Sequence, residues 1–311
     1  LVELALPAFN MPLTLAVFAD PLAVVLAACG MAAVGLLAGA YPALILSGFR
    51  PITALHGLSP TSRQGIVLRK GLVVFQFALS IALVVSTGVV FSQIEYMRSK
   101  DLGFDKEQMM AIHYYGDAAV QDNLSAYKQE LLRHPAVQAV SASGDIPGVG
   151  NLHSGVIIEN NAGEWQGEAW RYMSVDQDYL ATYSMEMAAG RSFSAAYPED
   201  DTRSLIINET AARQLGYLSP EQAIGKGFEF GERPRGEIIG VVRDFHLKSL
   251  QQAVDPTYLL MVPGRYQYLS LRLDTGNMQQ TVEDLTQIWQ RLVPHRPFEY
   301  TFVDDTFARL Y

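Results

Sequence analysis

The sequence has little of what catalytic and metal sites usually require. Its 311 residues include a single cysteine, Cys29, so no disulfide can form within the chain. Its six histidines show no HxxxH or HExxH spacing, and no GxxxxGKS/T run is present. Those patterns mark common zinc sites and the phosphate-binding loop of ATPases, and the G-x-S-x-G nucleophile turn is missing too. We therefore expect no metal, no cofactor and no enzymatic activity of this chain's own.

Acidic residues are almost missing from the first 94 positions. Of the chain's 32 acidic residues only two, Glu3 and Asp20, lie there, together with four of its 23 basic residues. The rest of the chain is therefore acidic overall. An acidic surface does not neutralise phosphates, as nucleic-acid binding requires, so we expect no nucleic-acid partner.

One acid–base pair could be considered for catalysis. Asp244 and His246 stand two residues apart, on one face if their segment is a strand. Such a pair needs a nucleophile or a metal within reach, and the sequence supplies neither. We expect surface or hydrogen-bonding roles for both.

A long uncharged run organises the chain. Residues 71–94 hold 24 positions without a charge, preceded by Arg69 and Lys70 and followed by Glu95. At about 1.5 Å per residue this run spans about 36 Å as a helix, enough to cross a hydrocarbon core of about 30 Å. The alternative is a buried core helix, but uncharged runs of this length are rarely found there. We predict a transmembrane helix.

A second uncharged run, residues 22–40, is rich in Ala and Gly. Gly35 and Gly39 form a GxxxG spacing, which lets membrane helices approach closely, and Pro42 ends or bends the helix. We predict a second transmembrane helix that packs against others. Residues 1–21 before it are expected to be the end of a truncated membrane helix and a periplasmic connection.

The segment between the two runs, residues 41–70, carries four basic residues and no acid. Short basic loops stay in the cytoplasm. Within it Phe49, Ile52 and Leu55 recur at helical spacing beside Arg50, as in a short amphipathic helix. Such a helix could anchor the loop at the membrane surface or contact an ATPase, and the sequence leaves both readings open.

The orientation follows from this loop. The 22–40 helix runs inward and the 71–94 helix runs outward, so Arg63 lies in the cytoplasm and Glu168 outside. Residues 95–108 would form a stalk, and residues 109–311 a periplasmic domain.

Two stretches of the outer region read as β-α-β units. Residues 109–113 and 137–141 are strand candidates around a helix marked by Leu124, Tyr127 and Leu131. The later unit has alternating strands at 269–273 and 298–302 around a helix whose apolar face is longer. That face comprises Met278, Val282, Leu285, Ile288, Trp289 and Leu292.

The middle region, about 151–245, reads as mainly β. Its strand candidates are 156–158, 205–207 and 238–242. Asn208 is a plausible N-cap for a helix over 209–215 that Gly216 closes. Trp165 and Trp170 could line a groove for an apolar or cationic ligand, or be half-buried sheet residues.

Several runs together resemble the MacB/FtsX-like permeases of bacterial ABC transporters. The resemblance covers nearly the whole chain and keeps the order of the pieces. The runs are Tyr41–Gly57, Leu68–Val85, Asp101–Ile112, Ile207–Gly216, Gly240–Leu250 and Phe298–Tyr311.

The resemblance implies α-helical transmembrane segments plus an α+β periplasmic domain, with two β-α-β porter-like units around a β-rich subdomain. It implies a multi-pass protein of the bacterial inner membrane, a piece of a longer permease whose further helices follow Tyr311. Because this chain has no phosphate-binding loop, the resemblance implies a separate cytoplasmic ABC ATPase partner. It leaves room for a periplasmic adaptor or an outer-membrane component.

The expected function is transmission of ATP-driven motion to the periplasmic domain, for export or extraction of a substrate. Two other classes stay open at this point. One is a membrane sensor whose periplasmic domain binds a ligand, and the other is a membrane-anchored enzyme. A fused cytoplasmic signalling domain would favour the sensor. Hydrolytic activity of the isolated outer domain would favour the membrane-anchored enzyme.

Overall fold

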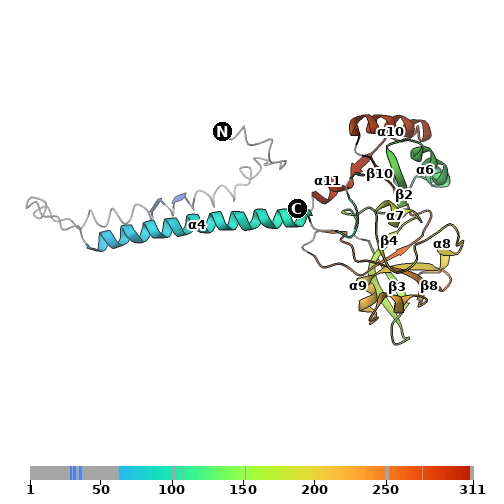
Figure 1. The fold of residues 1–311 in the computed structure, drawn as a ribbon, viewed down its shortest axis with the longest axis horizontal. Helices are drawn as coiled ribbons and strands as arrows, with labels where there is room; N and C mark the ends of the chain where they lie inside the picture. The colour runs from blue at the N-terminus through green and yellow to red at the C-terminus, as the bar shows by residue number, and fades with distance from the viewer. Residues whose placement is uncertain are drawn as a thin grey trace, which may run out of the picture. The chain divides into compact units, whose positions relative to one another are not determined.

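The structure is a computed structural model of the 311-residue chain. It describes residues 29, 31–32, 35–36, 63–99, 102–106, 108–150, 152–248, 252–274 and 276–308 (Figure 1). The chain divides into two compact units, residues 1–90 and 91–311, and each is described by itself.

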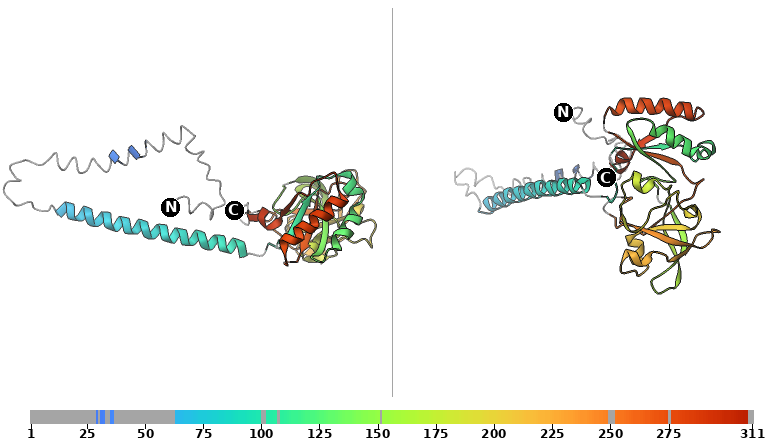
Figure 2. Two further views of the ribbon diagram at one scale, coloured as in Figure 1. Left: turned by 90° about the horizontal axis from the view of Figure 1, so that it is seen from above. Right: turned by 45° about the vertical axis from the view of Figure 1, so that its right-hand side comes forward.

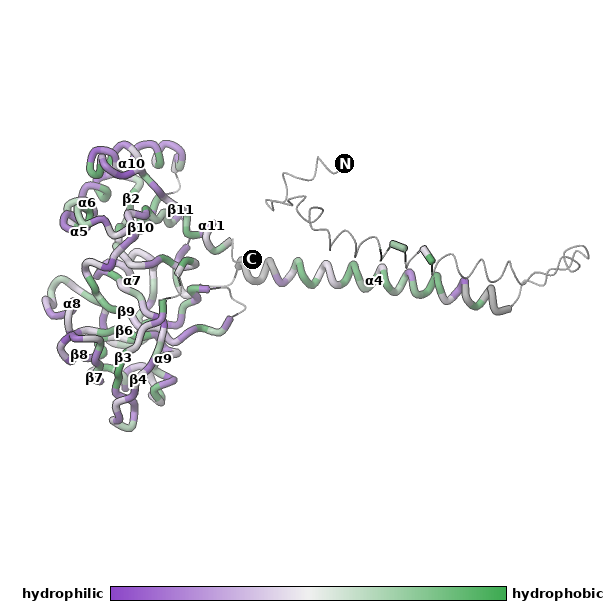
Figure 3. The backbone as a smooth tube through the Cα atoms, turned by 180° about the vertical axis from the view of Figure 1, so that it is seen from behind, coloured by the Kyte–Doolittle hydropathy of each residue, from purple (hydrophilic) through white to green (hydrophobic). Residues whose placement is uncertain are grey.

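Helix α4, Arg63–Ser99, contains the uncharged run. Its segment Arg69–Gln93 is long and apolar enough to cross a membrane, and none of it is buried inside the protein. Phe75, Phe77 and Phe91 are each about two-thirds exposed. Figure 3 shows green, hydrophobic segments recurring along α4. A helix at the position of the predicted outward span is therefore confirmed.

The helix is longer than the run that predicted it. It takes in residues 63–70 of the expected cytoplasmic loop and residues 95–99 of the expected stalk. Residues 63–99 contain no proline, and their only glycines are Gly65, Gly71 and Gly88, so little interrupts the helix once it has begun. The uncharged run in the sequence therefore predicts the part of the helix that can lie in lipid, but not where the helix begins and ends.

The predicted inward helix, residues 22–40, is described at five positions only, and all five are helical. Gly35 is one of them, and a Cβ built there would meet nothing within 4 Å. The other candidate packing and coupling residues lie outside the described residues. They are Gly39, Pro42, Phe49, Arg50, Ile52 and Leu55.

One half of the outer domain, the sheet half, is a four-stranded antiparallel sheet with α6 and α10 beside it (Figure 2). Its first part is β1 Met109–His113, α5 Ala118–Asp122, α6 Leu124–Leu132 and β2 Val137–Ser143. Its second part is β10 Tyr268–Leu273, α10 Met278–Leu292, β11 Tyr300–Phe302 and α11 Val303–Ala308.

The two β-α-β units interlock in this sheet. The strand order is β11-β1-β10-β2, so each unit has a strand of the other between its own two strands. This is the split β-α-β arrangement, in which neither unit is complete without the other. Residues 109–143 and 268–302 are thereby joined although more than a hundred residues separate them.

The other half, the ring half, is built from β3 to β9. Its strands are β3 His153–Glu159, β4 Trp165–Ser174, β5 Met187–Gly190, β6 Ser204–Asn208, β7 Gly227–Glu229, β8 Gly236–Val242 and β9 Thr257–Leu260. Its helices are α7 Tyr179–Thr182, α8 Asp200–Arg203, α9 Glu209–Gln214 and the 3₁₀-helix η3 Pro220–Ala223.

Six of these strands close on themselves. The ring has the order β8-β6-β9-β4-β3-β7, and it closes because β7 pairs with both β3 and β8. The seventh strand, β5, pairs with β8 on the same edge as β7, further along that strand. Alternate side chains such as Ile158, Tyr172, Ile207 and Tyr258 are buried in one core cluster. A ring this small has room only for side chains inside it.

A second core lies where the two halves meet. Met109 and Ala111 from β1 share it with Ile206 of β6 and Leu259 of β9. The third core is in the sheet half, where the apolar face of α10 packs, and Trp289 is fully buried there. The β-rich middle extends beyond the predicted limit of 245, because β9 belongs to its sheet.

Candidate functional site

The chain enters the outer domain through a buried segment. Leu102 and Phe104 are 4% and 7% exposed, only three and five residues after α4 ends. The backbone oxygen of Leu102 accepts from the His246 amide at 2.8 Å. The amide of Asp105 donates to the Tyr183 carbonyl at 2.9 Å. This part of the expected stalk is therefore anchored in the domain core.

Helix α11 lies in the same place. Val303 and Phe307 are buried in the core that contains Leu102 and Phe104. The rings of Phe104 and Phe307 have centroids 5.5 Å apart, tilted by 57°. The two ends of the outer domain thus contact each other directly.

A third segment completes this site. After β8, Phe245 and Leu247 are 2% and 5% exposed in the same core. We call residues 102–106, 245–247 and 303–307 the base. Its residues come from three distant parts of the sequence, so no local pattern could have revealed it.

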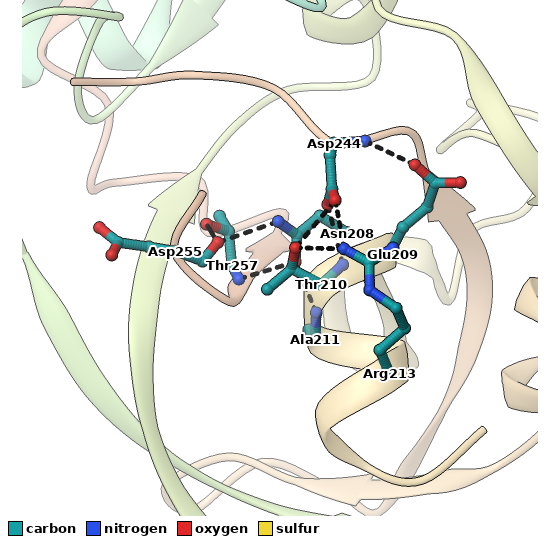
Figure 4. A network of polar contacts seen from close by, with 8 residues as sticks. All are labelled: Asn208, Glu209, Thr210, Ala211, Arg213, Asp244, Asp255 and Thr257. Atoms are coloured by element: carbon teal, nitrogen blue, oxygen red, sulfur yellow. Dashed lines mark hydrogen bonds and ion pairs between the residues drawn. The ribbon is translucent and has the colours of Figure 1, made fainter. Parts of the chain in front are cut away.

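The segment leading to the base is locked by a polar network (Figure 4). The Asp244 carboxylate accepts from the Thr210 amide and hydroxyl, each at 2.8 Å, and from Arg213 at 2.6 Å. In return the Asp244 amide donates to Glu209 at 3.0 Å. Asp244 therefore caps the N-terminus of α9, where a negative charge is favourable.

Asn208 performs the N-cap role that the sequence predicts. Its side-chain oxygen accepts from the Ala211 amide at 3.0 Å and from the Thr257 amide at 3.0 Å. Its side-chain nitrogen donates to the Asp255 carbonyl at 2.9 Å. One buried side chain therefore ties β6, α9 and β9 together.

The network gives Asp244 a structural, hydrogen-bonding role. Three donors already occupy its carboxylate, and the main chain of His246 is bonded to Leu102. The two runs 207–216 and 240–250 that carry the family resemblance are thus joined for a structural reason. Among the described residues, no group of three His, Cys, Asp or Glu is placed to hold a metal ion.

An ion pair connects the two halves away from the base. Lys128 of α6 contacts the carboxylates of Asp176 and Asp178, which lie between β4 and α7. Asp176 also accepts from the Ala142 amide at 2.8 Å. Burial acts to lower the pKa of Lys128, but the two carboxylates outweigh it and raise that pKa, so the lysine stays charged.

A cleft of about 540 Å³ lies between the two halves. Tyr268 and Gln267 line it from the sheet half, and Leu152 and Tyr172 from the ring half. Asp145, from the loop between β2 and β3, also lines it. Burial raises the pKa of Asp145 to about 6, although the Ile146 amide and the charge of Arg171 act to lower it.

The two tryptophans considered as groove residues differ in their exposure to solvent. Trp170 is 2% exposed inside the ring half, whereas Trp165 is 38% exposed. Trp165 lines a groove of about 610 Å³ in the ring half, and the guanidinium of Arg235 lies 4.1 Å from its ring centroid. Only Trp165 is therefore placed at a surface groove.

The sequence matches the family model of the MacB-like periplasmic core domain over residues 71–293, which is most of the chain. The chain belongs to this family. The match begins inside α4 and ends just after α10. The family unit therefore contains both the apolar helix and the two-part domain, while β11 and α11 lie outside it and still pack on the domain.

Two solved structures are similar to this chain. The periplasmic region of MacB from Actinobacillus actinomycetemcomitans is 14% identical, with a TM-score of 0.46, and the alignment covers 65% of this chain and 92% of that chain. The extracellular domain of the ABC-type transporter YknZ from Gram-positive bacteria is 13% identical, with a TM-score of 0.41, covering 62% and 97%. None of the curated proteins compared matches this chain.

Proposed function

We propose that this chain is the membrane subunit of a bacterial ABC transporter, with the MacB-like domain in the periplasm and α4 in the inner membrane. The observation that supports it best is the family match, which takes in an apolar helix and the domain as one unit. ATP hydrolysis belongs to a separate cytoplasmic partner, and this chain has no enzymatic activity. Export or extraction of a substrate follows from motion of the domain.

The base supports a mechanical role in this proposal. Leu102, which is buried in the base, follows the end of α4 by only three positions in the sequence. Helix α11 packs against the same segment through Phe307. In this proposal, motion of the membrane helix is passed to the domain through the buried segment 102–106.

The contact with the ATPase is proposed for residues 47–58 of the loop 41–70, through Phe49 and Leu55. Replacing both by Asp places two unpaired charges on an apolar patch. Each charge costs several kcal/mol if the patch is buried against the partner. We expect the Phe49→Asp, Leu55→Asp double variant to lose co-purification with the ATPase and to change ATP turnover of the complex.

A matched pair of substitutions controls for added charge. Ser59→Asp with Thr61→Asp adds the same two charges to polar positions of the same loop, and these should leave the complex intact. If the Phe49 and Leu55 variant co-purifies and turns over ATP as the unchanged protein does, the loop only anchors the chain at the membrane surface.

A further inference from the structure

We propose that residues 144–150, which we call the strap, couple the width of the cleft between the two halves to the position of α11 in the base. This inference rests on the proposed function, because it requires that the base moves when the partner ATPase binds or hydrolyses ATP.

The walls of the cleft belong to different halves. Tyr268 and Gln267 come from the sheet half, and Leu152 and Tyr172 from the ring half. A change in the angle between the halves therefore changes the cleft directly, and it must also rearrange the core that the two halves share. Packed elements of this kind move between discrete arrangements and do not deform continuously.

The ends of the strap are fixed at the cleft. Its first amide, on Gly144, donates to the Ser174 carbonyl at 2.8 Å. Its last carbonyl, on Gly150, accepts from Arg171 Nη2 at 2.9 Å. Ser174 and Arg171 are both on β4, so the strap leaves the sheet half and is held by the ring half at both ends.

The middle of the strap rests on the base. The Gly148 amide donates to the Leu247 carbonyl at 3.1 Å. A Cβ at Gly148 would lie 3.0 Å from Cγ2 of Thr306 and 3.1 Å from Cδ2 of Phe307. Helix α11 therefore packs closely on the strap at Gly148, and a methyl group there would be crowded against Thr306 and Phe307. A shift of α11 must move the strap or separate from it.

The strap carries one carboxylate, that of Asp145, which lines the cleft. The Asp145 carboxylate interacts electrostatically with Arg171 of β4, with Tyr179 of α7, with Tyr183 just after α7, and with Tyr268 of β10. Among the described residues, Nη1 of Arg171 and the hydroxyl of Tyr179 are buried without a hydrogen-bond partner. Polar groups left without partners are costly when buried.

The test uses the full-length permease with its ATPase, in membranes and in a Cys29→Ser background. One spin-label pair, at Leu152→Cys and Gln267→Cys, reports the cleft. A second pair, at Asp305→Cys on α11 and Leu218→Cys on the ring half, reports the base. Pulsed electron resonance measures both distance distributions without nucleotide and with ATP bound to a hydrolysis-deficient ATPase.

Gly148→Ala is the decisive variant, and Gly163→Ala is its control. Both glycines have a positive φ, +83° and +81°, so alanine is strained at either. Only Gly148 has atoms of α11 against the new methyl group, because nothing lies within 4 Å at Gly163. If Gly148→Ala does not fold, Phe307→Leu loosens the same contact from the other side.

We expect ATP to shift both distributions in the unchanged protein and in Gly163→Ala. In Gly148→Ala the cleft shift should be lost while the base shift remains. The proposed coupling through the strap is contradicted if the cleft distance still shifts with ATP in Gly148→Ala. It is also contradicted if the base distance shifts in the unchanged protein and the cleft distance does not. If neither pair responds to ATP in the unchanged protein, the proposed function fails with it.

Discussion

Asp145 carries its charge in a half-buried position beside the cleft. Burial raises its pKa from 3.8 to about 6, so ionising this carboxyl costs more free energy in the folded protein than in the unfolded one. For an acid with a raised pKa, the cost of ionisation in the folded state is full above pH 6 and disappears below the unfolded value of 3.8. A shift of this size corresponds to up to about 3 kcal/mol at neutral pH.

We therefore expect Asp145→Asn to be more stable than the unchanged protein at pH 7.5, by about 1–3 kcal/mol. The difference should shrink as the pH falls through 6 and vanish near pH 4. Denaturation by urea at a series of pH values measures it. Asp122→Asn, at an exposed helix end, controls for the loss of one negative charge. A difference that does not change with pH would contradict the assignment.

Residue-scale reasoning from the sequence succeeds where the cause is local. Asn208 is predicted as an N-cap because a side-chain oxygen before a helix binds amides two or three residues ahead, and it binds the Ala211 amide. Its second bond, to the Thr257 amide, links positions 49 residues apart. Contacts of that kind have no signature in the sequence, and the role of Asp244 is hidden for the same reason.

Among elements, the network around Asp244 holds α9 to the segment that enters the base. Removing this carboxylate leaves the Thr210 amide and hydroxyl and Arg213 without their acceptor. We expect Asp244→Ala to lower the free energy of unfolding by about 1–3 kcal/mol. Chemical denaturation of the outer domain measures the loss.

An exposed ion pair in the same half supplies the control for Asp244. Glu229 pairs with Arg235 at 2.7 Å, and the side chains are 39% and 62% exposed. Pairs of this kind contribute about 0–1 kcal/mol, so Glu229→Ala should have little effect. Equal losses in the two variants would show that the Asp244 network is no stronger than a surface ion pair.

Helix α10 is well predicted because its single buried face gives a helical apolar period, whereas the short strand β9 is missed. Helix α10 runs from Met278 to Leu292, the span that its apolar positions mark, and in Figure 3 hydrophilic and hydrophobic residues alternate along its tube. Strand β9, Thr257–Leu260, has all four residues buried, so no alternation reveals it. Its partners β4 and β6 cover both edges, which places it in the middle of the sheet.

For the whole molecule, the family and the α+β character follow from patterns that the sequence carries openly. The closure of six strands into a ring does not, because it depends on β7, three residues long, pairing with β3 and β8. The base is equally hidden, since its three segments meet only after both halves have folded. Long-range pairing of this kind is a property of the topology and not of any local window.

The central claim is that the MacB-like domain lies outside the membrane and the loop 41–70 lies in the cytoplasm. The direct measurement is labelling of intact cells with a membrane-impermeant thiol reagent, in a Cys29→Ser background. The reporters are Leu218→Cys, whose parent side chain is 90% exposed in the outer domain, and Arg63→Cys at the start of α4. We expect modification of position 218 in intact cells, and of position 63 only after the cells are permeabilised. Modification of position 63 in intact cells, with position 218 protected until permeabilisation, would contradict the account.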